Sequence, residues 1–397
     1  QRITDAKAID AKTAQFTLGV PFEPFLLMFD VTSCAMVPKH VYDGTDYRTN
    51  PANQTPIGTG PFRFVEWQRG QFVRLEKNPG YWQPGRPYLD GIIIRMMPDA
   101  AARAAAFEAQ EVQAGFFTPI PLSDLRRVAA LPHIAVTTEG YAMFAAMYIM
   151  ELNTRTQYLK DKRVRQAILL AMNREFIQEN IFFGYGKIAT GPLTSASPYY
   201  TKEGVPQYGF DAARANRLLD EAGFRRGAGN MRFKASIELT PSSEFSRVSE
   251  YMKQALSRVG IDIEIRTSDL GTLLRRLYTD YDFNVSQNFL YMLPDPSAGV
   301  QRLYYGPNIR PGVVFSNASG WSTPALDKLW EEALVSTSTG RRKEIFAEAQ
   351  RVVADELPCL NMFELDFTTI THKRVRDFMP GPDGAYTSMS DTWLATT

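Results

Sequence analysis

Residues 141–177 read YAMFAAMYIMELNTRTQYLKDKRVRQAILLAMNREFI, and this stretch predicts how the middle of the chain folds. Its first part, YAMFAAMYIM, is an unbroken apolar and small run that is shorter than a membrane span requires. Its length suits a strand buried on both faces. After a polar connector, Val164, Ala167, Ile168 and Ala171 recur at the spacing of one helix face. We therefore expect a buried strand followed by an amphipathic helix.

Strand and helix patterns alternate after this stretch. Residues 231–239 and 261–265 alternate apolar and polar side chains, as strands with one buried face do. A helical pattern over residues 244–259 lies between them. Asn173 and Asp211 each have a side chain that can cap a following helix. This alternation predicts an α/β fold with an open, largely parallel sheet and crossover connections.

The composition excludes few functions. The chain has 397 residues, which is more than one domain by the usual prior, and it is 44% hydrophobic and 22% charged. Its net charge of +1 gives no reason to expect nucleic acid or an anionic membrane as a partner. Cys34 and Cys359 can be a pair in an oxidising space or two separate packed thiols, and two cysteines do not identify a compartment.

Several further segments follow one another in an order that characterises a known family. They are IGTGPFRFVEW (57–67), NPGYWQPGRPYLDGI (78–92), ATGPL (189–193), YGFDAARANRLLDEAGF (208–224) and PDP (294–296). Together with LNT and the helical pattern after it, they make the chain similar to the family 5 extracellular solute-binding proteins. Members of that family are receptors of peptide, nickel and opine ABC importers.

The resemblance implies a two-lobed, periplasmic-binding-protein-like α/β fold of type II, of the large peptide-binding kind, with a two-strand hinge. Residues 1–151 and 360–397 are expected to form lobe I, and residues 152–359 form lobe II, an α/β insert. In the family a large piece of the first lobe precedes the point where this sequence begins. Lobe I is therefore expected to be incomplete at its N-terminus.

The function that the resemblance implies is binding without chemistry. The chain is expected to capture a small solute between its lobes, without a cofactor, and to deliver it to the transmembrane permease subunits of an ABC importer. The expected location is the periplasm. One alternative is a receptor of the same fold for a metal complex or an opine or sugar conjugate. Another is a hydrolase that uses carboxylates.

The segment NFLYMLPDP (288–296) follows a predicted strand, and loops at the carboxyl ends of strands in open α/β sheets bind ligands. In the family this loop lines the ligand, and peptide-binding members hold the peptide's amino group with an Asp three positions before the acidic residue of the turn. That position here is Met292. Methionine suits apolar or aromatic contact, so a peptide with a free N-terminus is not expected. Asp295 is expected to be a turn residue.

The candidate ligand contacts come from this loop and from the apolar strand. They are Phe144, Met147, Tyr148, Asn288, Phe289, Tyr291 and Met292. Packing in the core remains the alternative for these apolar and aromatic side chains. Glu151 is a charge within the apolar strand and needs a partner if it is buried.

No pattern in the sequence favours catalysis or a metal site. The chain has three histidines, which are His40, His133 and His372. None has the spacing to another ligand that a metal motif requires. No GxSxG motif occurs. Two carboxylate pairs lie on single helix faces, Glu108 with Glu111 and Asp327 with Glu331, where such pairs are usually solvated.

Overall fold

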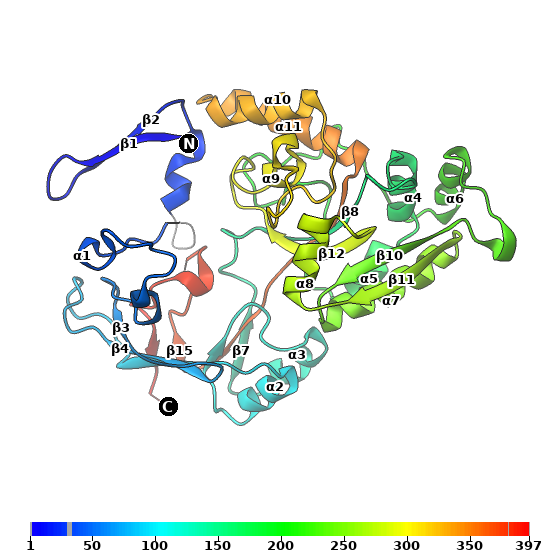
Figure 1. The fold of residues 1–397 in the computed structure, drawn as a ribbon. Coiled ribbons are helices and arrows are strands. Elements are labelled where there is room, and N and C mark those ends of the chain that lie inside the picture. Colours follow the sequence, from blue (N-terminus) through cyan, green and yellow to red (C-terminus); the bar gives the residue numbers. More distant parts are fainter. Residues whose placement is uncertain (1, 30–33, 380, 397) are drawn as a thin grey trace. The chain divides into compact units, whose positions relative to one another are not determined.

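The computed structural model describes residues 2–29, 34–379 and 381–396, which group into two compact units (Figure 1). Unit 1 contains Gln1–Leu26 and Phe144–Asp366, and unit 2 contains Leu27–Met143 and Phe367–Thr397. The lobe boundaries near residues 151 and 360 stay a prediction. The two compact units change at 143–144 and 366–367, because strands β8 and β13 pair along their lengths in the sheet of unit 1.

Unit 1 is built on a six-stranded sheet. In spatial order its strands are β11 (Ile261–Thr267), β10 (Phe233–Leu239), β12 (Val285–Tyr291), β8 (Ala146–Leu152), β13 (Cys359–Glu364) and β9 (Lys187–Ile188). β10 runs parallel to β11 and to β12, whereas β8 is antiparallel to β12 and to β13, and β13 is antiparallel to β9.

The expectation of a largely parallel sheet is therefore wrong. Among the described strands, parallel pairing joins only β10 to its two neighbours, β11 and β12. β8 and β13 are the strands next to the two chain passages at 143–144 and 366–367, and they pair antiparallel to each other. β8 is also antiparallel to β12 on its other side.

The helices of unit 1 cover this sheet. They are α4 (Lys162–Leu170), α5 (Arg174–Asn180), α6 (Ala212–Glu221), α7 (Ser243–Ser257), α8 (Leu270–Arg275), α9 (Gln301–Tyr304), α10 (Pro324–Val335) and α11 (Thr339–Glu356). The predicted caps are confirmed, since Asn173 accepts a hydrogen bond from Phe176 N and Asp211 accepts one from Arg214 N. A hairpin of β1 (Ile3–Ala8) and β2 (Ala14–Leu18) also belongs to this unit.

Unit 2 contains small antiparallel sheets and short helices. Its elements are α1 (Lys39–Tyr42), β3 (Phe62–Gln68), β4 (Phe72–Lys77), β5 (Gly91–Arg95), α2 (Ala100–Glu108), β6 (Ala114–Gly115), α3 (Leu122–Ala129), β7 (Ile134–Thr137), β14 (Thr369–His372), β15 (Val375–Arg376) and β16 (Trp393–Leu394). β14 lies between β6 and β7, so the C-terminal segment completes a sheet begun much earlier in the chain. Across the described residues, no helix is both long and apolar enough to span a bilayer.

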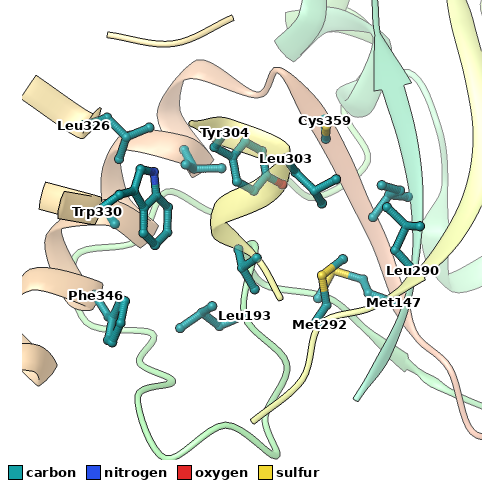
Figure 2. Close-up of a cluster of buried hydrophobic side chains, with 14 of the residues drawn as sticks. Met147, Leu193, Leu290, Met292, Leu303, Tyr304, Leu326, Trp330, Phe346 and Cys359 are labelled. Carbon is teal, nitrogen blue, oxygen red and sulfur yellow. The ribbon is translucent and has the colours of Figure 1, made fainter. Parts of the chain in front are cut away.

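One face of the unit 1 sheet packs on an apolar cluster shown in Figure 2. β8 contributes Met147, β12 contributes Leu290, and Trp330 and Phe346 come from α10 and α11. Trp330 and Phe346 are almost completely shielded from solvent. Burial of such large side chains stabilises unit 1 by roughly 1.5–3 kcal/mol for each aliphatic or phenyl group. The face is therefore filled by protein side chains.

Both cysteines are free thiols. Cys34 is exposed, whereas Cys359 is buried in the apolar cluster of Figure 2. Of the two alternatives that the sequence left open, the structure shows separate thiols.

Candidate functional site

The candidate site lies where β12 extends past its neighbour β10. β10 pairs with β12 at Val285 and Ser286, and the ladder between these two strands stops there. β12 continues to Tyr291 with β8 along its other side. We call residues 288–291 the projecting end of β12. It is the carboxyl end of a strand in an α/β sheet, which is the position where such sheets bind ligands.

The side chains of the projecting end alternate between the two faces of the sheet. Phe289 lies opposite Tyr148 of β8, so both point to one face. Leu290 lies opposite Met147, and both belong to the apolar cluster on the other face. Figure 2 shows Met147, Leu290 and Met292 close together within that cluster. The seven candidate residues are therefore divided between the two faces of the sheet.

Four of the candidates are buried. Met147 and Tyr148 are 0% exposed, and Met292 is 1% exposed. Phe144 is also buried, and its ring centroid lies 4.9 Å from that of Tyr291. Tyr148 Oη donates a hydrogen bond to Gln287, and its ring stacks 5.2 Å from that of Phe245. These four side chains are packed in the protein interior next to the projecting end.

Phe289 is the most solvent-exposed of the seven, with 39% of its surface accessible. Its ring centroid lies 6.1 Å from that of Tyr291, which is partly exposed. Asn288 is also partly exposed and faces the side of the sheet opposite to Phe289. An exposed aromatic pair at the end of a strand can pack against an apolar or aromatic part of a solute.

A buried carboxylate lies on the Asn288 face. Glu151 of β8 is completely shielded, and Tyr278 Oη lies 3.3 and 3.2 Å from its two carboxylate oxygens. Ser286 Oγ donates to Glu151 Oε2 at 3.3 Å. Burial raises the pKa of Glu151 to about 7, and hydrogen bonds from Tyr278, Ser286 and Asn288 oppose that rise. The structure thus supplies the partners that a charge in this strand requires.

Tyr278 reaches Glu151 from an irregular helical turn. Residues Arg276–Asp280 form a π-helical turn directly after α8, and Tyr281 ends it in the left-handed conformation at φ 52°. Such turns are rare and often occur at functional sites. The turn brings the hydroxyl of Tyr278 to the carboxylate of Glu151.

Sequence reasoning missed Arg302, which lies on α9. Its Nη2 donates to the backbone oxygen of Tyr291 at 2.9 Å, so the guanidinium lies against the projecting end of β12. Burial lowers the pKa of Arg302, and the charges of Tyr278 and Glu151 oppose that shift. Arg302 is the only basic residue between Arg276 and Arg310, but no sequence pattern links it to the end of β12.

Asp295 has a structural partner, in agreement with its prediction as a turn residue. Its Oδ2 accepts a hydrogen bond from Arg342 Nη2 at 2.5 Å, and both side chains are buried. Ser297 N donates to Asp295 Oδ1 at 2.9 Å, which closes the turn. The same loop is tight at Gly299, where a Cβ atom would lie 1.7 Å from the backbone oxygen of Met292.

The carboxylate pairs considered for hydrolysis are each bound to neighbouring groups. Glu108 pairs with Arg127, and Glu111 pairs with Arg95 at 3.3 Å. Asp327 accepts a hydrogen bond from Gly306 N at 2.8 Å. Glu331 accepts one from Tyr305 Oη at 2.9 Å. These contacts explain the four carboxylates as local structural groups.

The structure brings together two histidines that are distant in the sequence. His133 and His372 stack in unit 2 with ring centroids 5.4 Å apart. Their Nε2 atoms lie 3.1 Å from Phe107 O and 3.2 Å from Gln110 Oε1. Within the described ranges, no group of three or more His, Cys, Asp and Glu side chains is placed to hold a metal ion.

Comparisons with known proteins agree on one family. The sequence model of the bacterial extracellular solute-binding proteins, family 5 Middle, matches residues 1–311. Oligopeptide-binding protein AppA of Bacillus subtilis (strain 168) is 26% identical over 343 residues, which cover 82% of this chain and 60% of AppA. Glutathione-binding protein GsiB of Pectobacterium atrosepticum is 26% identical over 394 residues, covering 96% of this chain and 72% of GsiB.

A solved structure confirms the predicted fold. The structure of AppA from Bacillus subtilis in complex with a nonapeptide has a TM-score of 0.85 at 21% identity, covering 100% of this chain and 79% of that chain. This likeness supports the two-lobed α/β fold of type II that the sequence implied. Since the family model matches well over half of the residues, the chain belongs to the bacterial extracellular solute-binding proteins, family 5.

Proposed function

We propose that this chain is the solute-binding component of an ABC importer and that it captures a peptide-like solute at the projecting end of β12. The observation that carries the proposal is the end of the β10 ladder at Ser286, beyond which β12 continues with the exposed Phe289. An extended solute can continue that ladder through main-chain hydrogen bonds. The names of the relatives AppA and GsiB, which refer to oligopeptides and glutathione, support a peptide-like solute.

The proposal assigns different tasks to the candidate residues. Phe289, Tyr291 and Asn288 contact the solute, because they are the exposed or partly exposed members of the set. The buried candidates hold the shape of this end of the sheet; they are Phe144, Met147, Tyr148 and Met292. Met292 occupies the position where peptide-binding relatives are expected to have an amine-binding Asp. The proposed solute therefore lacks a free amino group at that point.

The proposal includes the periplasm as the location and transmembrane permease subunits as partners. The solute is bound and then released unchanged to the permease. Capture by closure works only when the solute binds the closed arrangement more tightly than the open one. The proposal requires no cofactor and no chemical step.

Native mass spectrometry of the purified chain, followed by denaturing release, tests this function. We expect a small molecule that leaves on denaturation and fragments at amide bonds. A released sugar conjugate or metal complex would favour a receptor of the same fold for another solute. For a chain that purifies without a bound molecule, thermal unfolding with a library of N-acetylated peptides replaces the release step. Stabilisation is expected, and its absence across the library would contradict the proposal.

A further inference from the structure

Arg302 lies at the place where the proposed solute would end. Its Nη2 atom is 2.9 Å from the backbone oxygen of Tyr291, the last residue of β12. The side chain is partly exposed to solvent. Its position follows from the tight loop before α9, because the approach of Gly299 to Met292 turns the chain back toward the strand.

The donors of Arg302 are largely unused. A guanidinium carries five N–H groups, and among the described residues the partner of Arg302 is the oxygen of Tyr291. Its Nε atom is shielded from water and has no hydrogen-bond partner in the described part of the chain. Buried polar groups nearly always have partners, so such a group indicates a ligand or water that satisfies it.

The nearby carboxylate does not satisfy these donors. Glu151 interacts with Arg302 through its charge, but no ion pair within 4.0 Å joins Arg302 to any described acidic residue. The oxygens of Glu151 accept hydrogen bonds from Tyr278 and Ser286 instead. Glu364, at the end of β13, accepts a hydrogen bond from Ser195 Oγ at 2.6 Å. In the sheet, β8 lies between β13 and β12.

We propose that Arg302 forms an anion subsite at the projecting end of β12 and that the solute carries a carboxylate there. The planar fork of a guanidinium matches the two oxygens of a carboxylate better than any other common side chain does. Met292 is buried in the apolar cluster and offers no carboxylate, so Arg302 gives this end of the site a positive charge. The inference rests on the proposed function, because it requires the solute to lie along residues 288–291.

The test compares two forms of each solute by calorimetry with the 397-residue chain. The probes are N-acetylated tripeptides, each made as the free acid and as the C-terminal amide. We expect the free acids to bind about tenfold to a hundredfold more tightly than the amides. Arg302→Met is expected to remove this preference by weakening the acids and leaving the amides within about threefold. Arg302→Lys keeps the charge without the fork and should retain part of the preference.

Arg351→Met is the matched control, since Arg351 lies on α11 and donates to Glu203 O and Glu348. It should leave the preference unchanged. Circular dichroism and the melting temperature establish that each variant folds. Equal binding of acids and amides by the unaltered chain, or an equal loss of both in Arg302→Met, would overturn the anion subsite alone. Failure of every probe to bind would overturn the proposed function, and the subsite with it.

Discussion

Tyr278 Oη lies 3.2 and 3.3 Å from the two oxygens of Glu151, a carboxylate that is fully buried in the central strand β8. The two residues come from elements far apart in the sequence, a π-helical turn and the strand that precedes α4. Ser286, directly opposite Glu151 on β12, donates the next hydrogen bond. These contacts hold an ionisable group next to the projecting end of β12.

The first prediction concerns the pH dependence of stability. The pKa of Glu151 is about 7 in the folded chain, against an ordinary value of 4.5. The folded state therefore holds the proton more tightly than the unfolded state, and stability falls as pH rises from about 4.5 to about 7. The loss attributable to Glu151 is on the order of 3 kcal/mol above that range.

Glu151→Gln should remove this part of the dependence of stability on pH, because the amide does not ionise. Melting temperatures of both chains between pH 5 and pH 8 provide the measurement. Glu264→Gln is the control, since Glu264 is an exposed carboxylate on β11 paired with Arg266. If the melting temperature changes equally with pH in the unaltered chain and in Glu151→Gln, Glu151 does not titrate in this range.

The second prediction separates the two faces of β12. Phe289→Ala should weaken binding of the released solute about tenfold, because an exposed aromatic contact is lost with little change in the core. Leu290→Ala, at the next position, should instead lower stability by about 2–5 kcal/mol, because Leu290 is buried in the apolar cluster. Calorimetry and thermal unfolding measure the two effects. An unchanged affinity in Phe289→Ala would remove this residue from the site.

The third prediction concerns the buried ion pair between Asp295, in the loop after β12, and Arg342 of α11. Asp295→Asn leaves the charge of Arg342 without its partner, so unfolding should require about 3–5 kcal/mol less. Glu348→Gln breaks a pair with Arg351 that is much more exposed, and should cost less than about 1 kcal/mol. Urea unfolding compares these isosteric substitutions. Equal small losses would show that the buried pair contributes no more than a surface pair.

The fourth prediction concerns the close approach of Gly299 to the loop. Gly299→Ala places a methyl group where the oxygen of Met292 lies, so the loop must move and both stability and solute affinity should fall. Gly209→Ala is the matched control, because nothing lies within 4 Å of its Cβ position. Thermal unfolding and calorimetry follow both variants. A Gly299→Ala chain with normal stability and affinity would show that the loop does not shape the site.

Local features of this fold were predictable from the sequence, whereas the direction of its strands was not. The caps at Asn173 and Asp211 depend on a few neighbouring residues, and the structure confirms them. The antiparallel pairing of β8 with β13 joins residues that are more than 200 positions apart in the sequence, for example Leu360 with Met150. No local pattern encodes such a long-range choice, so helices alternating with strands led to the wrong expectation of a largely parallel sheet.

The position of the candidate segment at the end of a strand was predictable from the sequence, whereas its side-chain contacts were not. The segment after β12 was recognised from its position at the end of a strand. Period-two alternation also assigns Phe289 and Met292 to opposite faces, a step that the sequence alone permits. Arg302 was not predictable as a site residue, because its contact with Tyr291 depends on how the loop at Gly299 folds back.

Hydrogen–deuterium exchange with and without the released solute tests the central claim most directly. The account predicts that the backbone amides of residues 288–291 exchange more slowly when the solute is bound, because the solute continues the ladder that β10 leaves at Ser286. The amides of α6, which packs against α4, serve as the internal reference. Tight binding with unchanged exchange at residues 288–291 would contradict the account.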